Sequence, residues 1–139
     1  MVPGCTGQFS PDGKWIAYES NESGRFEIYV QPFRGPGRKT QVSLKGGAQV
    51  RWRRDGKALF YIALDGRLTE VPIRFSASGQ AAEPGPAISL FVAHVGGANQ
   101  PQEPQQYAVS PNGDRFLMNV VTQETSASPI TVILNWKPR

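Results

Sequence analysis

The sequence predicts an all-β protein built from repeated four-stranded antiparallel sheets, and three observations support this fold class. First, a ten-residue phrase with a central turn occurs three times, at residues 9–18, 52–61 and 109–118. Second, the turns lie at Asp12, Asp55 and Asn112, at intervals of 43 and 57 residues (12 to 55, 55 to 112). Third, 12 prolines and 15 glycines are spread along the chain, and no segment has the pattern of a helix. A period of about forty residues, with strand-like sequence on both sides of each turn, is typical of the blades of a β-propeller.

The centre of each phrase is a dipeptide that favours a tight hairpin: Asp12-Gly13, Asp55-Gly56 and Asn112-Gly113. These residue types tolerate the positive φ angles that such turns require. After each turn comes a run of aliphatic and aromatic residues, which is typical of a strand buried on both faces. The large apolar residue before each turn is expected to pack between adjacent blades: Phe9, Trp52 or Val109.

The rest of the sequence contains further predicted strands for each repeat. We expect third strands at 27–33 and 68–73, outer fourth strands at 39–43 and 87–92, and a last strand at 130–136. The 14 residues 93–106 lack periodicity and are rich in Gly, Gln, Pro and Asn, so we expect a loop inserted between blades. The chain is therefore predicted to be a partial propeller over residues 1–139, with blade 1 at about 6–44, blade 2 at about 48–92 and an incomplete blade 3 at about 107–136.

Three blades cannot close a ring, because propellers have roughly four to eight. A partial ring exposes two blade faces and a sheet edge. Either the chain is part of a longer protein, or two copies assemble into a six-bladed homodimer. We favour the first for the natural gene and self-association for the isolated chain.

Composition narrows the classes of partner. The net charge is +4, and the basic groups near residues 34–39 and 51–57 are expected to be solvated turn residues, so nucleic acid is not favoured as a partner. The single cysteine, Cys5, rules out an internal disulfide. No signal-peptide pattern occurs, and no apolar run reaches the ~18 residues of a membrane helix. We expect no membrane contact within this chain, and these residues leave its compartment unknown.

We find no constellation of residues that would carry catalysis. The only histidine, His94, lies at the start of the inserted loop, and no Gly-x-Ser-x-Gly motif is present. A zinc site would need several His or Cys ligands, and the aspartates occur one per turn rather than in clusters. We therefore predict a protein that is not an enzyme and has no cofactor and no metal site.

The best candidates for ligand contacts lie at the start of each innermost strand, beside the central channel. Aligning the repeats places Gln8, Arg51 and Ala108 in one register, with Gln49 and Gln106 two residues before the last two of these. Alternation along a strand turns these positions away from Phe9, Trp52 and Val109. We predict a channel-rim ligand-binding set of Gln8, Gln49, Arg51 and Gln106; the alternative is that these side chains only solvate the channel. The inserted loop at 93–106 is a second candidate, since long loops on rigid scaffolds often carry recognition.

The repeated phrases resemble the TolB-like, WD-like propeller repeats of bacteria. The resemblance is carried by residues 9–18, Ile-Tyr-Val at 28–30, Gly46-Gly47 and Trp-Arg-Arg-Asp-Gly-Lys at 52–57. With Val-Ser-Pro-Asn-Gly-Asp-Arg-Phe-Leu at 109–117 and Thr-Val-Ile-Leu-Asn-Trp at 131–136, the order of phrases is similar to the C-terminal propellers of bacterial serine/threonine protein kinases. The kinase motifs themselves do not occur in this sequence.

The resemblance implies a non-catalytic binding, sensory or scaffold module that acts through protein–protein or peptide contacts. It also implies a place in a larger bacterial signalling protein, outside the cytoplasm. The alternative is the gating propeller of a prolyl-oligopeptidase-like serine peptidase, which requires a hydrolase domain after residue 139. We rank this alternative second, because residues 136–139 have the character of a chain end.

Overall fold

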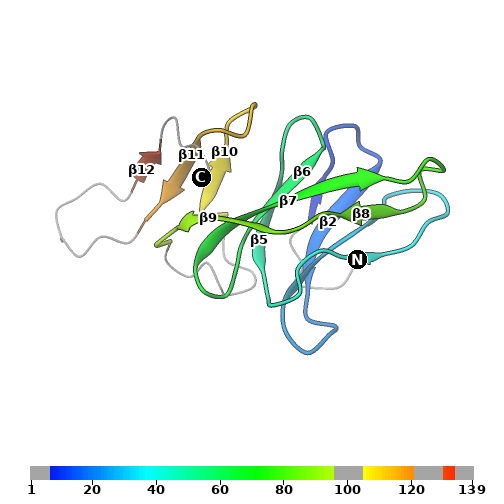
Figure 1. Cartoon of the computed structure of the whole chain (residues 1–139), viewed down its shortest axis with the longest axis horizontal. Coiled ribbons are helices and arrows are strands. Elements are labelled where there is room, and N and C mark those ends of the chain that lie inside the picture. The colour runs from blue at the N-terminus through cyan, green and yellow to red at the C-terminus, as the bar shows by residue number, and fades with distance from the viewer. Residues whose placement is uncertain (1–6, 96–104, 121–129, 134–139) are drawn as a thin grey trace.

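The computed structural model describes residues 7–95, 105–120 and 130–133. Every regular element within these ranges is a β-strand. The strands form three antiparallel sheets that follow one another in chain order (Figure 1). The predicted all-β fold is confirmed. In this described part of the chain, no helix is long and apolar enough to span a membrane.

Blade 1 is a four-stranded sheet in the order β1-β2-β3-β4. Its strands are β1 (Gly7–Phe9), β2 (Trp15–Ser20), β3 (Glu27–Pro32) and β4 (Thr40–Gln41). In β2 the buried side chains of Trp15, Ala17 and Glu19 alternate with the half-buried Ile16 and Tyr18. This alternation separates two faces of the blade, and the face that carries Trp15 and Ala17 packs against blade 2.

Blade 2 contains one strand that the sequence did not predict. Its strands are β5 (Ala48–Trp52), β6 (Ala58–Ile62), β7 (Arg67–Phe75), β8 (Ala82–Pro84) and β9 (Ile88–Val92). The third strand, expected at 68–73, extends to Phe75, where it pairs with β8; its beginning pairs with β9. The additional hairpin forms because a turn follows directly, closed by the Gly79 N–H donating to the Ser76 carbonyl at 2.8 Å.

Blade 3 comprises β10 (Tyr107–Val109), β11 (Phe116–Asn119) and β12 (Ile130–Ile133). The last strand was expected at 130–136, of which residues 134–136 lie outside the described residues. The same holds for residues 96–104 of the predicted inserted loop. At its described beginning, Val95 forms an isolated antiparallel bridge with Val120 of blade 3.

The three turns of the repeated phrase share one geometry. Gly13, Gly56 and Gly113 have φ angles of 72°, 72° and 75°, and each N–H donates to the carbonyl three residues earlier at 2.8–2.9 Å. Glycine accepts such a φ angle without strain, because it has no Cβ atom. The turn aspartates add local bonds: Oδ1 of Asp12 accepts the Lys14 N–H at 3.0 Å. The hydroxyl of Ser10, which also donates to this carboxylate, lowers the pKa of Asp12.

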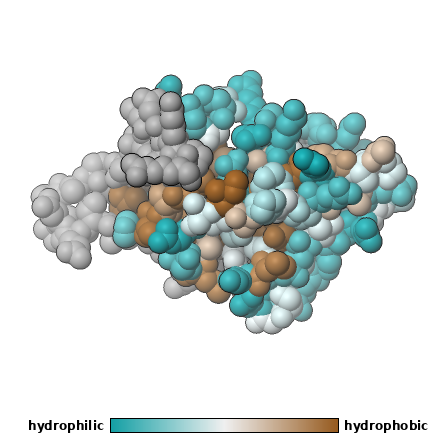
Figure 2. Space-filling view, viewed as in Figure 1, coloured by the Kyte–Doolittle hydropathy of each residue, from teal (hydrophilic) through white to brown (hydrophobic). Residues whose placement is uncertain are grey.

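The core lies between the blades rather than within them. One apolar cluster joins blade 1 to blade 2, and a second joins blade 2 to blade 3 through Phe60 and Phe116, whose rings meet edge to face at 5.3 Å. Trp52 and Val109 pack against these clusters, whereas Phe9, at the equivalent position of blade 1, is 53% exposed. On the side shown in Figure 2, apolar residues form separate patches among polar ones.

Candidate functional site

The innermost strands of the three blades meet in one region. β1, β5 and β10 each form an edge of their sheet. Between blades 1 and 2, the indole Nε1–H of Trp52 donates to the carbonyl of Gln8 at 2.9 Å. Between blades 2 and 3, the N–H of Gln106 donates to Oε1 of Gln49 at 2.8 Å. We call the group Glu19, Gln49, Arg51, Gln106 and Tyr107 the inner-strand junction.

Gln49 connects all three blades. Its N–H donates to the carboxylate of Glu19 in blade 1, and its carbonyl accepts the hydroxyl of Tyr107 in blade 3 at 2.7 Å. The pairing of β5 with β6 shifts register between Ala48 and Arg51, and Gln49 has a φ of 58°, so the strand bulges here. The bulge interrupts the alternation on which the predicted channel-facing direction rested. Gln49 is only 2% exposed and lies between the blades.

Two buried titratable groups lie beside Gln49. Glu19 is 3% exposed, and burial raises the pKa of its carboxyl group, although the N–H groups of Gln49 and Val50 donate to it and oppose this rise. Burial also raises the pKa of the Tyr107 hydroxyl well above its ordinary value, with the charge of Glu19 acting in the same direction and that of Arg51 against it. Glu19, Arg51 and Tyr107 are therefore close enough to interact electrostatically.

Arg51 presents hydrogen-bonding capacity that the described chain does not use. The residue is half-buried, and its position opposite Phe60 places it on the side of β5 that faces blade 3. Its Nε atom is buried and finds no hydrogen-bond partner among the described residues. The same is true of Oε1 of Gln105, directly before β10. A donor and an acceptor on neighbouring blades are thus both unsatisfied, which is uncommon for buried polar groups.

The other predicted site residues occupy different positions. Gln106 is tied to β11, because its Oε1 accepts the Nδ2–H of Asn119 at 2.8 Å and its carbonyl accepts the Asn119 N–H at 2.8 Å. Gln8 is half-buried on β1, at the contact between blades 1 and 2. The structure therefore brings Gln49 and Gln106 into direct contact and places Gln8 at the neighbouring blade boundary.

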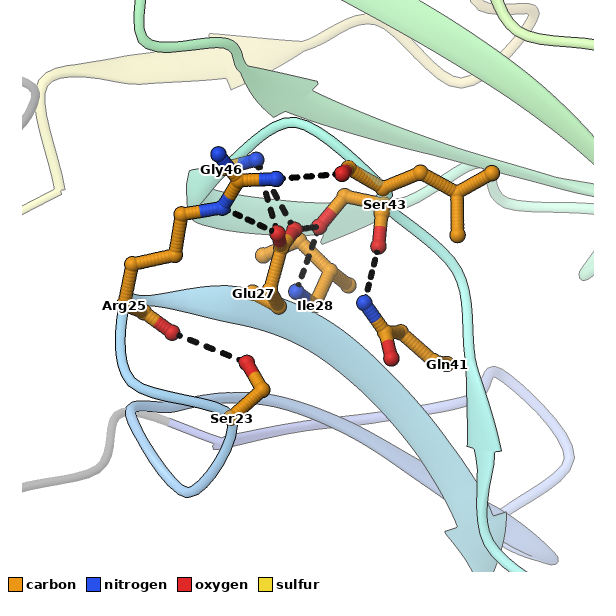
Figure 3. A network of polar contacts seen from close by, with 8 residues as sticks. Ser23, Arg25, Glu27, Ile28, Gln41, Ser43 and Gly46 are labelled. Carbon is orange, nitrogen blue, oxygen red and sulfur yellow. Dashed lines mark hydrogen bonds and ion pairs between the residues drawn. The ribbon is translucent and has the colours of Figure 1, made fainter.

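A second buried carboxylate, Glu27, holds the connection from blade 1 to blade 2 (Figure 3). Glu27 is 1% exposed, and both of its carboxylate oxygens lie 2.9 Å from the N–H of Gly46. It also accepts the Ser43 hydroxyl and pairs with Nε of Arg25 at 2.7 Å. Sequence reasoning missed both Glu19 and Glu27. The signal that could have found them is an acidic residue at the end of one apolar strand and at the start of the next.

A cleft of about 540 Å³ lies apart from the junction, between the β1–β2 turn of blade 1 and the β7–β8 hairpin of blade 2. Its apolar lining includes Trp15 and Phe75, whose rings lie 4.8 Å apart, and Lys14 and Arg34 contribute positive charge.

In the described part of the chain, no group of three or more His, Cys, Asp or Glu residues could hold a metal ion. The polar groups of the junction are suited to hydrogen bonding and ion pairing.

Comparison with known proteins identifies the fold. No protein-family model matches the sequence, and no curated protein does either. Among solved structures, the chain is similar to TolB from Acinetobacter baumannii, with a TM-score of 0.55 and 17% identity over 88% of this chain and 29% of that chain. A protein assigned as a 6-phosphogluconolactonase, from Bacteroides uniformis, gives a TM-score of 0.46 and 15% identity over 86% of this chain and 34% of that one.

The chain thus spans about a third of the length of these proteins or less. The likeness to TolB shows the fold, and it confirms the predicted class of antiparallel β-propeller blades. The described sheets hold four, five and three strands in chain order. The resemblance of the repeated phrases to TolB-like repeats is confirmed at the level of this fold. The described sheets are blades of a partial, TolB-like β-propeller.

Proposed function

We propose that this chain is a non-catalytic binding module that takes up a protein or peptide segment at the inner-strand junction. The observation that carries the proposal is the half-buried Arg51, whose buried Nε has no hydrogen-bond partner among the described residues. A buried donor that stays unpaired costs about 1–3 kcal/mol, more if it is charged. A ligand that supplies an acceptor to Arg51 recovers this free energy.

A peptide segment fits the chemistry of the junction. Its carbonyl groups, or a carboxylate, would accept from Arg51, and an N–H group would donate to Oε1 of Gln105. Arginine pairs with carboxylates in a planar, bidentate geometry, which favours an acidic side chain or a C-terminal carboxylate as the anchor. We assign no reaction to the junction. Its one carboxyl group, that of Glu19, already accepts the N–H of Gln49.

We further propose that the module belongs to a larger bacterial signalling protein. Support comes from the order of the repeated phrases, which is similar to the propellers of bacterial serine/threonine kinases, and from the short span of the chain relative to TolB. Sequencing the gene on both sides of this segment tests the point. A kinase domain upstream agrees with it, whereas a hydrolase domain downstream favours the peptidase alternative.

Selection from a random peptide library displayed on phage tests the binding site itself. We expect the chain to enrich peptides with a conserved carboxylate, and Arg51→Ala to weaken their binding at least tenfold in a direct titration. Arg54→Ala is the matched control, because Arg54 is exposed on the β5–β6 turn and lies outside the junction. Equal binding by the wild type and Arg51→Ala, or no enrichment at all, would contradict the proposed site.

A further inference from the structure

A second cleft, of about 570 Å³, lies between blades 1 and 2 beside their outer strands, and we call it the outer-strand cleft. Blade 1 supplies one wall, from the connection between β4 and β5. Blade 2 supplies the other wall, from the β6–β7 turn and the connection between β8 and β9. Both blades are described, so the cleft does not depend on what precedes or follows this sequence. Its volume lies in the range of about 300–1,000 Å³ that is typical of ligand sites.

Both walls of this cleft are held by hydrogen bonds within the chain. In the blade 1 wall, the N–H of Gly46 lies 2.9 Å from both carboxylate oxygens of Glu27 (Figure 3). In the blade 2 wall, the N–H of Gly85 donates to the carbonyl of Pro72 at 2.8 Å. The walls also meet, because a Cβ atom added at Gly46 would lie 2.3 Å from the side chain of Leu64. The cleft is therefore pre-formed, as most small-molecule sites are.

The buried lining residues of the cleft bring two hydroxyl groups to it. Tyr61 is 5% exposed, and its hydroxyl makes no hydrogen bond to any described residue. Burial raises the pKa of Tyr61, and the charges of Glu27 and Asp65 act in the same direction, so this hydroxyl keeps its proton and can donate it. The hydroxyl of Thr69, also 5% exposed, donates to the carbonyl of Arg67 at 3.3 Å, and its oxygen can still accept. The cleft thus offers one buried donor and one buried acceptor.

The charges around the cleft favour a neutral ligand. Its lining holds one cation and one anion, the exposed side chains of Lys45 and Asp65. An anionic group at the Tyr61 hydroxyl would meet the negative charges of Glu27 and Asp65, both of which reach this hydroxyl. An ammonium group would leave the hydroxyl without an acceptor, because it can only donate. The side chains of the remaining lining are mostly apolar: Val42, Leu44, Ala63, Leu64, Pro86 and Ala87.

We propose that the outer-strand cleft binds a small neutral alcohol or phenol, whose apolar body lies between the two walls and whose oxygen accepts the hydroxyl of Tyr61. Such an oxygen gives this hydroxyl the hydrogen bond that the described residues do not supply. The hydroxyl group of the ligand also has a proton to donate, which Thr69 can accept. The cleft shares no residue with the inner-strand junction, so this proposal and that of the peptide site are tested separately.

Titration of the ¹⁵N-labelled chain with three probes of one shape, followed by amide chemical shifts, tests the class of ligand. The probes are benzyl alcohol, benzoate and benzylamine, which are neutral, anionic and cationic at pH 7. We expect benzyl alcohol to shift the amide signals of residues 42–46 and 61–65 in a saturable way, and to bind at least fivefold more tightly than the two charged probes. No saturable shift, or equal affinity for benzoate or benzylamine, would overturn the proposal.

Three variants test the site with benzyl alcohol as the probe. Tyr61→Phe keeps the ring and removes the hydroxyl, so it should weaken binding at least threefold. Tyr29→Phe is the matched control, because Tyr29 is 4% exposed and lies outside the cleft, and its affinity should equal that of the wild type. Ala87→Trp fills the cleft from an exposed position and should abolish binding while circular dichroism reports an intact fold. Wild-type affinity in Tyr61→Phe or in Ala87→Trp would show that the ligand does not occupy this cleft as proposed.

Discussion

Glu19 is buried at the end of β2, where its carboxyl group accepts the N–H of Gln49 from the next blade. Its burial makes the protonated form more favourable than it is in the unfolded chain, and the pKa lies above the ordinary value of 4.5. The folded state therefore binds this proton more tightly than the unfolded state does. By linkage, the resulting stability is fully present below pH 4.5 and is lost as the pH rises through the raised pKa.

The pH dependence of unfolding tests this role of Glu19. Urea denaturation of the wild type between pH 4 and pH 8 should show a free energy of unfolding that falls as the pH rises above 4.5. Glu19→Gln carries no titrating group at this position. Its free energy of unfolding should therefore not show this fall above pH 4.5. Glu83→Gln, at an exposed position on β8, serves as the control and should keep the wild-type slope. A Glu19→Gln curve parallel to that of the wild type would show that this carboxyl group does not govern the slope.

At the scale of elements, the connection from β4 to β5 is held by hydrogen bonds of two consecutive glycines, Gly46 and Gly47. Gly46 donates to Glu27, and Gly47 donates its N–H to the carbonyl of Phe26 at 3.0 Å. A Cβ atom added at Gly47 would lie 2.9 Å from the ring of Tyr61 and 3.1 Å from the side chain of Ile28. Both neighbours are buried in or beside the core, so neither can move aside freely.

Gly47→Ala should therefore destabilise the protein by about 1–3 kcal/mol, the usual cost of overpacking a core. Gly85→Ala is the matched change, because its added Cβ would come no closer than 3.4 Å to Pro72 and the residue is exposed. We expect this control to change stability by no more than about 0.5 kcal/mol. The midpoint of urea denaturation, followed by tryptophan fluorescence, measures both. Equal stability of the two variants would mean that Tyr61 and Ile28 relax around the new methyl group.

The elements that local sequence specifies were the ones predicted correctly. Strands β2 and β6 follow from apolar runs after Asp-Gly turns, whose geometry depends on a few adjacent residues. The β7–β8 hairpin was missed although a local turn closes it. Phe75 in this hairpin also contacts Trp15 and Trp52 of other strands, and such contacts have no local pattern in the sequence. The junction was predicted only as a set of register positions. Its bonds join residues 30 to 58 positions apart, and the bulge at Gln49 breaks the alternation that sequence reasoning assumed.

At the scale of the whole molecule, blade 2 is the only described sheet that contributes to both apolar clusters. Leu59 and Val71 face blade 1, whereas Phe60 and Leu68 face blade 3. Blades 1 and 3 share no cluster, so they are coupled through blade 2 and through the polar bonds of Gln49. An array of this kind resembles repeat proteins, in which stability is roughly a sum of units and nearest-neighbour interfaces. Local opening can then begin at one end of the array while the other end stays folded.

Hydrogen exchange in two reciprocal core variants tests this coupling. Phe116→Ala removes a buried ring between blades 2 and 3, at a cost of about 3–5 kcal/mol, and Ile28→Ala removes a buried side chain between blades 1 and 2, at about 2–5 kcal/mol. We expect Phe116→Ala to accelerate exchange in β10 and β11 far more than in β2 and β3, and Ile28→Ala to do the reverse. If each variant accelerated exchange equally in all three sheets, the blades would unfold as one cooperative unit, because the interfaces would then be too strong to open one at a time.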